Sequence, residues 1–354
     1  MTNFDRRQFV AGAAAITAAG ACSSASAHEN KLPIGAWTPL ADHPFPVQEI
    51  YPAPFWRDSI STNTLKPQPF NIVVSAGGLT PGTEYNVTDR VTYYDPVTNI
   101  WGAGTRLPAP RHHIALVNNN GLLYAIGGFA RDNNGGWQMR ANCWRLGDVL
   151  DDWDYMAQMP YPQAESVCAS LGGFIHVAGG RSPSGSLNRE WANHIDTDEH
   201  WIYDAASDRW EPLAPMLTAR NSAAGAVVNG VMYVIGGRTV SDGNTNKVEV
   251  YDPLSDRWEN ARPLPQAASG LAAAVINRKI YVFGGEYFSP GTGGAYAEAW
   301  EYDPRSDKWR AVAAMPRRRH GLGAVSMNNT IYVIGGAVRA GGNGTSSAVD
   351  RFEI

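Results

Sequence analysis

Short apolar stretches that end in two glycines recur about every fifty residues along this chain. In the most regular copy, Gly-Val-Met-Tyr-Val-Ile-Gly-Gly runs from Gly230 to Gly237. Apolar runs of about four to eight residues between turn residues are typical of buried β-strands. The double glycines that follow such runs are Gly77-Gly78, Gly127-Gly128, Gly179-Gly180, Gly236-Gly237, Gly284-Gly285 and Gly335-Gly336. The pattern predicts one strand-rich unit for each double glycine.

A second signature follows most of the double glycines. It is an aromatic residue and an aspartate, with a tryptophan six residues after the aspartate. A degenerate copy has Gly147 at the aspartate position and keeps Trp153. The segment between aspartate and tryptophan, as in Asp-Pro-x-Ser-Asp, predicts a hairpin turn between a third and a fourth strand. The regular copies are Tyr94-Asp95 with Trp101, Tyr203-Asp204 with Trp210, Tyr251-Asp252 with Trp258, and Tyr302-Asp303 with Trp309.

Together the double glycines and the Tyr-Asp/Trp units resemble the Kelch repeat, over about residues 37–354. The resemblance implies an all-β, six-bladed β-propeller, in which each four-stranded sheet buries both faces against its neighbours. The last copy stops at Phe352-Glu353-Ile354 and lacks its tryptophan strand. We expect the segment Ala36–Leu40 to supply that strand, so that the ring closes without an exposed edge. The propeller domain is predicted to span residues 28–354.

The first 27 residues are predicted to be an export signal rather than part of the fold. Arg6-Arg7 precedes a weakly apolar run that is too short to span a bilayer. The arginine pair resembles the twin-arginine signals that export folded bacterial proteins. Ala25-Ser26-Ala27 fits a cleavage site, which would leave His28 as the mature start and a periplasmic or secreted protein. Lipidation of Cys22 is the alternative.

Bulk composition excludes several classes of function. The net charge of −4 argues against nucleic-acid binding. Downstream of the signal no segment is apolar for long enough to span a membrane. The interpretation is a monomer whose partner is a small molecule. Cys143 and Cys168 are the cysteines that remain after maturation, and we expect two free thiols, with pairing left open.

The topology of a four-stranded meander predicts where a binding site lies. Residues just before each first strand and residues just after each double glycine should share one face and surround the central channel. Arginines outnumber carboxylates at these positions, which predicts a basic mouth that attracts anions. The alternative is that the arginines only pair with neighbouring blades. The candidate ligand-binding residues are Glu49, Arg111, Glu165, Arg181, Arg220, Asn221, Arg238, Tyr287 and Arg319.

Three residues among these positions are candidates for proton transfer. His112 and His320 precede first strands, and Glu286 opens an aromatic, glycine-rich loop. Imidazole and carboxylate groups are the usual general acids and bases. The alternative interpretation makes the histidines hydrogen-bonded rim residues and Glu286 a partner of a neighbouring arginine.

The insert at residues 188–200 contains a weak metal pattern. In an extended segment His194, Asp196, Asp198 and His200 would point to one face. Plant specifier proteins of Kelch type carry a different ligand spacing, so a polar loop is the favoured interpretation. A copper site like that of galactose oxidase is disfavoured, because that propeller has seven blades. We therefore expect no cofactor.

Two functions remain open from the sequence. The first is an exported propeller that binds an anionic or sugar-like small molecule, an acidic peptide or a glycan at the channel mouth. The second rests on a resemblance to bacterial N-acetylneuraminate mutarotases, which interconvert the anomers of an acidic sugar. That activity needs one group to protonate the ring oxygen and another to take the anomeric hydroxyl proton.

Overall fold

The computed structural model describes residues 33–58, 69–82, 86–132, 134–289 and 292–354. The predicted export signal and its cleavage site lie outside these residues. The described chain is built from β-strands, with two short 3-10 turns, η1 (Trp191–Asn193) and η2 (Ala340–Gly342). None of its helices is long and apolar enough to cross a membrane.

Six four-stranded antiparallel sheets form the blades. The first three are β2 (Ala53–Asp58), β3 (Pro69–Ala76), β6 (Val91–Asp95) and β7 (Ile100–Gly104); β8 (Ala115–Asn119), β9 (Leu122–Ile126), β12 (Cys143–Leu146) and β13 (Asp154–Met156); and β14 (Val167–Leu171), β15 (Phe174–Ala178), β18 (His200–Asp204) and β19 (Arg209–Leu213). The next two are β20 (Ala224–Val228), β21 (Val231–Ile235), β24 (Val248–Asp252) and β25 (Arg257–Ala261); and β26 (Ala272–Ile276), β27 (Lys279–Phe283), β30 (Ala299–Asp303) and β31 (Lys308–Val312).

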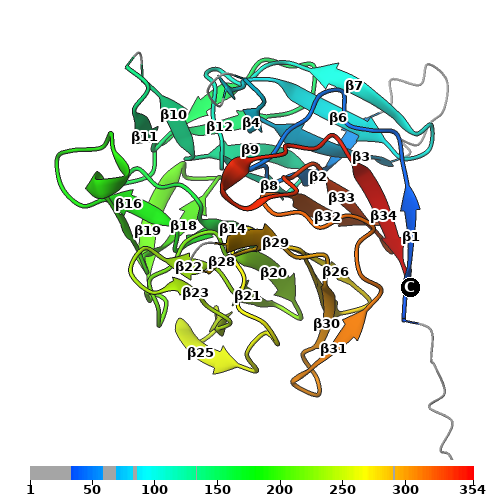
Figure 1. The fold of residues 1–354 in the computed structure, drawn as a ribbon. Helices are drawn as coiled ribbons and strands as arrows, with labels where there is room; N and C mark the ends of the chain where they lie inside the picture. Colours follow the sequence, from blue (N-terminus) through cyan, green and yellow to red (C-terminus); the bar gives the residue numbers. More distant parts are fainter. Residues whose placement is uncertain (1–32, 59–68, 83–85, 133, 290–291) are drawn as a thin grey trace, which may run out of the picture. The chain divides into compact units, whose positions relative to one another are not determined.

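The sixth blade combines the two ends of the described chain. Its strands are β32 (Gly323–Met327), β33 (Thr330–Ile334), β34 (Val349–Glu353) and β1 (Ala36–Pro39), and β1 pairs antiparallel with β34. The innermost strands contact one another in the order β2, β8, β14, β20, β26 and β32, and β32 contacts β2 again (Figure 1). The predicted six-bladed all-β propeller, closed by the N-terminal strand, is confirmed.

The loops between second and third strands form small hairpins on one face of the ring. They are β4 (Leu79–Thr80) with β5 (Asn86–Val87), β10 (Phe129–Arg131) with β11 (Trp137–Met139), β16 (Arg181–Pro183) with β17 (His194–Asp196), β22 (Arg238–Thr239) with β23 (Gly243–Asn244), and β28 (Glu286–Ser289) with β29 (Thr292–Ala295). These hairpins stand beside the channel, so they supply side chains to its mouth.

The tryptophans of the repeat join each blade to the preceding one. Trp258 Nε1 donates a 2.8 Å hydrogen bond to the carbonyl of Ala214 in the preceding blade, and Tyr251 donates to Asp256 in the hairpin turn. Trp37 on β1 donates in the same way to Ala313, so the closing strand repeats the internal pattern. The equivalent bonds run from Trp101 to Ala41, Trp153 to Thr105, Trp210 to Ala157 and Trp309 to Arg262.

The double glycines bring neighbouring blades together near the axis. Gly237 N–H donates to the carbonyl of Ala268, which precedes the next first strand. Gly236 has φ +62°, and a Cβ there would lie 2.8 Å from the same carbonyl oxygen. A side chain would therefore force the blades apart. The equivalent bonds run from Gly78 to Arg111, Gly128 to Gln163, Gly180 to Arg220, Gly285 to Arg319 and Gly336 to Val47.

Cys143 is buried on β12 and Cys168 is half-buried on β14, and both are free thiols. Burial raises the pKa of Cys168 to about 12. A thiol with so high a pKa is protonated near neutral pH and is therefore a weak nucleophile.

Candidate functional site

The two predicted sets of positions meet in every blade. In each blade, a residue just before the first strand bridges to the residue just after a double glycine; it stands three places before that strand, or five in the first blade. Asn221 pairs with Arg238 and Ser269 with Glu286 in this way. The prediction that both sets share one face of the ring is confirmed.

The residue after each of these bridging positions belongs to a backbone ring around the channel. We call it the axial ring; it consists of Glu49, His113, Glu165, Ser222, Gly270 and Gly321, with φ between +49° and +59°. Main-chain hydrogen bonds connect its members from blade to blade, such as Glu49 N to Gly321 O at 2.7 Å and His113 N to Glu49 O at 3.0 Å. Only three members carry ionisable side chains, and these three lie on consecutive blades. The ionisable side chains of the axial ring therefore all lie on one half of it.

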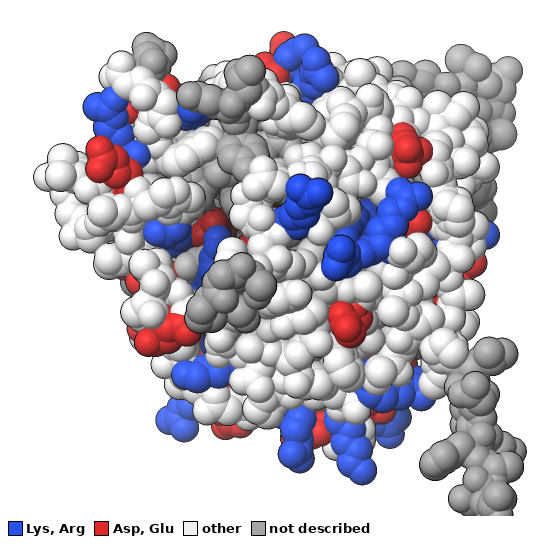
Figure 2. Space-filling view, in the orientation of Figure 1, with Lys and Arg blue, Asp and Glu red and all other residues white. Residues whose placement is uncertain are grey.

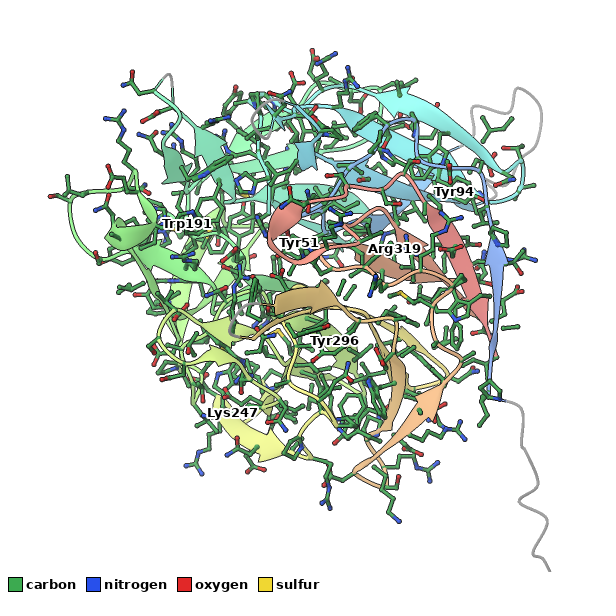
Figure 3. The ribbon with its side chains drawn as sticks, in the orientation of Figure 1. Tyr51, Tyr94, Trp191, Lys247, Tyr296 and Arg319 are labelled. Atoms are coloured by element: carbon green, nitrogen blue, oxygen red, sulfur yellow. The ribbon has the colours of Figure 1, made fainter. Side chains whose placement is uncertain are left out.

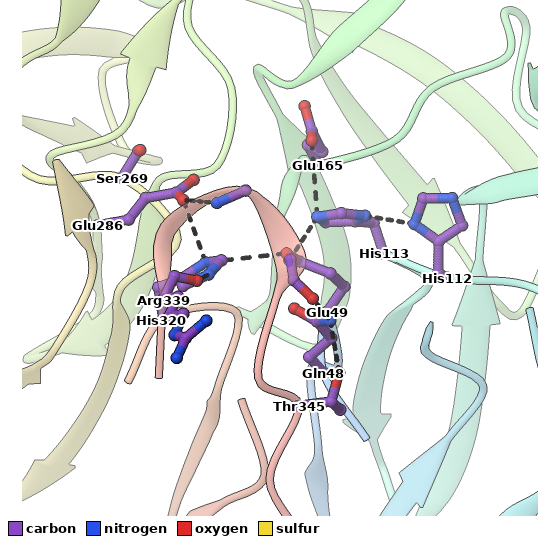
Figure 4. A network of polar contacts seen from close by, with 12 residues as sticks. Gln48, Glu49, His112, His113, Glu165, Ser269, Glu286, His320, Arg339 and Thr345 are labelled. Carbon is purple, nitrogen blue, oxygen red and sulfur yellow. Dashed lines mark hydrogen bonds and ion pairs between the residues drawn. The ribbon is translucent and has the colours of Figure 1, made fainter. Parts of the chain in front are cut away.

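Ionisable side chains gather above the axial ring. We call them the axial cluster; they are Glu49, His113, Glu165, Arg238, Glu286 and His320. Figure 4 shows all of them except Arg238 as labelled side chains. One of the two closest pairs in the cluster joins His113 Nε2 to Glu49 Oε2 at 2.7 Å. Burial alone would lower the pKa of His113, but Glu49 and Glu165 raise it above its ordinary value. Burial would raise the pKa of Glu49, but His113 holds it well below the usual range. Both shifts favour the charged forms of the pair, a protonated His113 beside an ionised Glu49.

His112 contacts His113 of this pair on the side away from Glu49. Its Nδ1 lies 2.7 Å from Nδ1 of His113, and its ring stacks on Phe129. Burial and the neighbouring His113 lower the pKa of His112 well below its ordinary value, so His112 is neutral. A neutral imidazole accepts at one nitrogen, and a charged imidazole donates at both. His113 therefore donates one N–H to Glu49 and the other to His112.

Arg238 spans three blades across the mouth. Its Nη1 donates to Glu286 Oε1 at 2.7 Å, and its Nη2 lies 3.4 Å from Glu165 Oε1. Its Nε donates to Asn221 Oδ1 at 3.0 Å, and Asn221 in turn donates to Asp196. Because Asn221 and Asp196 fix the guanidinium from the side, Arg238 holds one orientation above the channel.

His320 lies between two carboxylates. Its Nε2 is 2.7 Å from the carbonyl oxygen of Arg339, which can only accept, so Nε2 carries a hydrogen. Its Nδ1 faces Glu286 Oε2 at 3.4 Å and Glu49 Oε1 at 3.9 Å. Glu286 Oε2 also accepts from Gly341 N–H. Nδ1 of His320 thus faces two carboxylates without a hydrogen bond to either, which leaves this nitrogen open to a bound molecule.

Exposure separates the groups that meet a ligand from those that support them. The side chains of Glu49 and Arg238 are 15% and 25% exposed, while that of Glu165 is fully buried. Glu49 Oε1 lies 3.9 Å from His320 Nδ1, which is beyond hydrogen-bond distance, so it can accept a further hydrogen bond. A molecule that enters the mouth therefore contacts Glu49 and Arg238 first.

Below the cluster the channel continues as a cavity of about 110 Å³, lined by small residues and Tyr51. Tyr51 lies near the middle of the ring (Figure 3). Burial, Glu49 and Glu165 raise the pKa of Tyr51 well above its ordinary value. Its hydroxyl is therefore protonated and can donate within the channel.

Three of the predicted ligand-binding arginines lie away from the mouth, in the interior of their blades. Arg220 pairs with Glu249 at 2.6 Å, and Arg319 pairs with Asp350 at 2.6 Å, all with side chains at most 2% exposed. Arg111 donates to Asn142 and lies over Trp144. Figure 3 shows Arg319 within the last blade rather than at the channel. The alternative of structural pairing holds for these three.

The expectation of a basic mouth is corrected as well. Three carboxylates and one guanidinium form the cluster together with the two imidazoles. On the face shown in Figure 2, positive and negative side chains are interspersed among uncharged ones, with no large patch of one sign. Of the arginines that gave the excess positive charge, Arg220 and Arg319 point into the blades, where Glu249 and Asp350 balance their charge.

Other predicted residues divide between the cluster and its surroundings. Glu49, Glu165, Arg238, Glu286 and His320 come together, with Asn221 bound to Arg238. Arg181 is buried and stacks on Trp191 at 4.1 Å. Tyr287 lies in a separate pocket on β28, and His112 supports His113 instead of facing the channel.

His113 and Tyr51 were missed as site residues. Aligning the segments before the first strands would have identified His113, because Gln48-Glu49, His112-His113 and Ala164-Glu165 occupy the same register. Tyr51 has no aromatic counterpart in the other repeats. At the start of most of the other first strands, the equivalent position holds an alanine or a glycine. No sequence signal indicated it.

The weak metal candidates of the 188–200 insert do not converge. Asp196 ends β17 and accepts from Asn221 and Val240, while His200 begins β18 and lies 3.0 Å from His176. The intervening turn breaks the extended segment that the one-face pattern assumed. Among the described residues, no three His, Cys, Asp or Glu are arranged to hold a metal ion.

Comparisons with known proteins match this architecture. The family described as "KLHDC2/KLHL20/DRC7 Kelch-repeats domain" matches residues 63–285 and 193–346. Kelch-like protein 23 of Homo sapiens is 28% identical over 72% of this chain, and Kelch-like protein terF of Aspergillus terreus is 25% identical over 75%. The chain spans 42% of the former and 58% of the latter. A solved structure titled "Structure of YjhT" covers 88% of this chain and 95% of its own, with a TM-score of 0.70 and 17% identity.

Proposed function

Because the chain belongs to the Kelch-repeat family, whose propellers carry varied functions on one fold, we propose its function from the axial cluster and not from the fold. We propose that the mouth binds a small polyhydroxylated, sugar-like molecule. The observation that carries the proposal is that the mouth offers both a part-exposed acceptor, Glu49 Oε1, and a part-exposed donor, Arg238. Hydroxyl groups both donate and accept, so one diol satisfies both side chains.

The charge of the cluster supports a sugar over a polyanion. Glu49, Glu165 and Glu286 outnumber Arg238, and His113 is already paired with Glu49. A multiply charged anion would meet repulsion that a neutral or singly charged sugar avoids. Arg238 can still accept one carboxylate of an acidic sugar in place of a hydroxyl.

Ligand titrations followed by saturation-transfer NMR test the proposal. The probes are free hexoses, a hexuronic acid and N-acetylneuraminate. We expect Glu49→Gln and Arg238→Gln each to weaken binding at least about tenfold, since each removes one of the two contacts. Glu259→Gln and Arg257→Gln are matched controls, because both residues are exposed on β25 of the outer edge. Unchanged binding in Glu49→Gln, with the fold intact, would overturn the proposal.

A second candidate function is anomer interconversion at the same site. It is supported by His320, whose Nδ1 lies between Glu49 and Glu286. Glu49 would remove the proton of the anomeric hydroxyl while the His320–Glu286 pair supplies a proton to the ring oxygen, which opens the ring; reclosure on the other face reverses both transfers. NMR exchange spectroscopy of the bound sugar measures the rate. We expect His320→Asn to lower the rate about a hundredfold while binding persists; exchange no faster with protein than without it would exclude the activity.

Export remains a proposal that rests on residues 1–27. Replacing Arg6-Arg7 by two lysines should retain the protein in the cytoplasm of a bacterial host that exports the unaltered chain, because the twin-arginine pathway reads the arginine pair. Fractionation and immunoblotting measure this. If the lysine variant is still exported and carries a lipid on Cys22, the lipidation alternative is favoured.

A further inference from the structure

The β28–β29 hairpin has a second face, directed away from the axial cluster. Successive side chains of a strand point to opposite faces, so Glu286 points to the axis and Tyr287 points outward. Gly294 lies opposite Tyr287, and a Cβ there would lie 2.6 Å from the Tyr287 hydroxyl. The absence of a side chain at Gly294 thus lets the ring of Tyr287 lie across the hairpin.

Tyr287 and Tyr296 form one wall of a pocket on this outer face. Their ring centroids are 4.9 Å apart, with an angle of 39° between the planes. The pocket has a volume of about 370 Å³, which falls within the usual range of small-molecule sites. Its remaining lining residues are Ala295, Ala297, Glu298 and Arg318. Tyr296 lies beside the hairpin in Figure 3.

The rim of this pocket offers one negative and one positive group. Glu298 and Arg318 are both exposed, and no ion pair joins them within the described part of the chain. Burial, Glu298 and Tyr287 raise the pKa of Tyr296, which indicates that its hydroxyl lies near that carboxylate. Because the two charges balance, the rim favours neither anions nor cations. It favours a molecule that donates and accepts hydrogen bonds together.

We propose that this pocket is a second carbohydrate site, which takes one neutral pyranose ring against Tyr287 and Tyr296. The C–H groups on one face of a sugar carry partial positive charge and pack on the negative face of an aromatic ring. The hydroxyls at the sugar's edge bond to Glu298 and Arg318. The site does not depend on the axial cluster, since the hairpin separates the two and they share no side chain.

Saturation-transfer NMR with methyl β-glucopyranoside and methyl N-acetyl-β-glucosaminide, on the full chain, tests the second site. In the Arg238→Gln variant, saturation transfer from the second site should remain. Adding Tyr296→Ala should abolish this transfer. Adding Tyr155→Ala instead should leave it unchanged, because Tyr155 is an exposed tyrosine on β13. Ala297→Trp fills the pocket without removing either ring and should have the same effect as Tyr296→Ala, which keeps the test valid if Tyr296→Ala unfolds.

The outcomes separate this site from the mouth. Loss of transfer in Ala297→Trp alone, with Arg238→Gln unaffected, supports the outer site even if the mouth binds no sugar. Transfer that persists in the double variant Arg238→Gln, Ala297→Trp overturns it, because the mouth contact is then removed as well. Stronger binding of inorganic phosphate than of either glycoside also overturns it, because the rim would then select charge instead of hydroxyls.

Discussion

Arg220 and Arg238 belong to the same blade and both pair with glutamate, yet they have different roles. Arg220 is fully buried and bonds within its own blade, to Glu249 on β24 and to the carbonyl of Val234 on β21. Arg238 is part-exposed and contacts Glu165 and Glu286 on the two neighbouring blades. The comparison teaches that neither residue type nor an ion pair marks the site. What distinguishes the site residue is that its side chain is exposed above the channel.

The largest effect of a single substitution is expected at the buried pair. Arg220→Ala leaves Glu249 charged and unpaired in the interior, which should lower the free energy of unfolding by about 3–5 kcal/mol. Chemical denaturation measures this loss. The double variant Arg220→Met, Glu249→Leu should recover most of it, because no buried charge then remains unpaired. A single variant as stable as the unaltered protein would remove the distinction between the two arginines.

Acid should break the interior before the mouth. Burial lowers the pKa of His176 to about 4 and that of His200 to about 3, with Tyr251 packed against both rings. In the unfolded chain both pKa values are near 6.5, so the unfolded state binds more protons below that pH. Their contribution is present above pH 6.5 and should fall towards pH 4 by about 3 kcal/mol for each histidine, since one unit of pKa shift corresponds to about 1.4 kcal/mol. Thermal unfolding against pH measures it, and His176→Gln should flatten the curve.

The contribution of the Glu49–His113 pair to stability depends on pH in the opposite direction. The folded pKa of His113 is raised above its unfolded value, so its stabilisation is present at low pH and is lost as pH rises through the folded pKa. His113→Gln should therefore destabilise the protein more at pH 6 than at pH 9. An equal loss at both pH values would show that Glu49 and His113 do not interact as ions.

Removing Arg238 should cost less stability than removing Arg220. Arg238→Ala loses hydrogen bonds to Glu286 and Asn221, but water can reach part of the side chain and solvate Glu286 in its place. We expect a loss of about 1–2 kcal/mol, together with the weakened sugar binding described above. Chemical denaturation of both arginine variants under one condition compares them. A loss equal to that of Arg220→Ala would make Arg238 part of the scaffold.

A loss of stability no larger than that of Arg238→Ala is expected at the axial ring. Gly321 has φ +57°, and a Cβ there would lie 2.8 Å from the Glu49 carboxyl group. Gly321→Ala should destabilise the protein by about 1–2 kcal/mol and displace Glu49, which weakens sugar binding. Gly172→Ala is the matched control, since Gly172 has φ +64° with open space around its Cβ position. Equal sugar binding by the two variants would show that Glu49 tolerates displacement.

Much of the site could be predicted because the repeat supplies a register. The positions before the first strands and after the double glycines identified Glu49, Glu165, Arg238, Glu286 and His320. The register also aligns His113 with Glu49 and Glu165, and the left-handed backbone shared by these three positions turns their side chains to the channel. It could not identify Arg220 and Arg319 as buried, since their partners Glu249 and Asp350 lie about thirty residues away on third strands.

The sequence by itself determined the six blades and the closing strand, because glycine pairs, tryptophans and apolar runs act locally and repeat in every copy. The tertiary structure alone decided the charge of the mouth. Whether an arginine faces the channel or a partner inside its blade depends on packing between strands far apart in the chain. The outer face of the β28–β29 hairpin follows the same rule: Tyr287 forms a separate pocket because Tyr296 and Arg318 pack beside it.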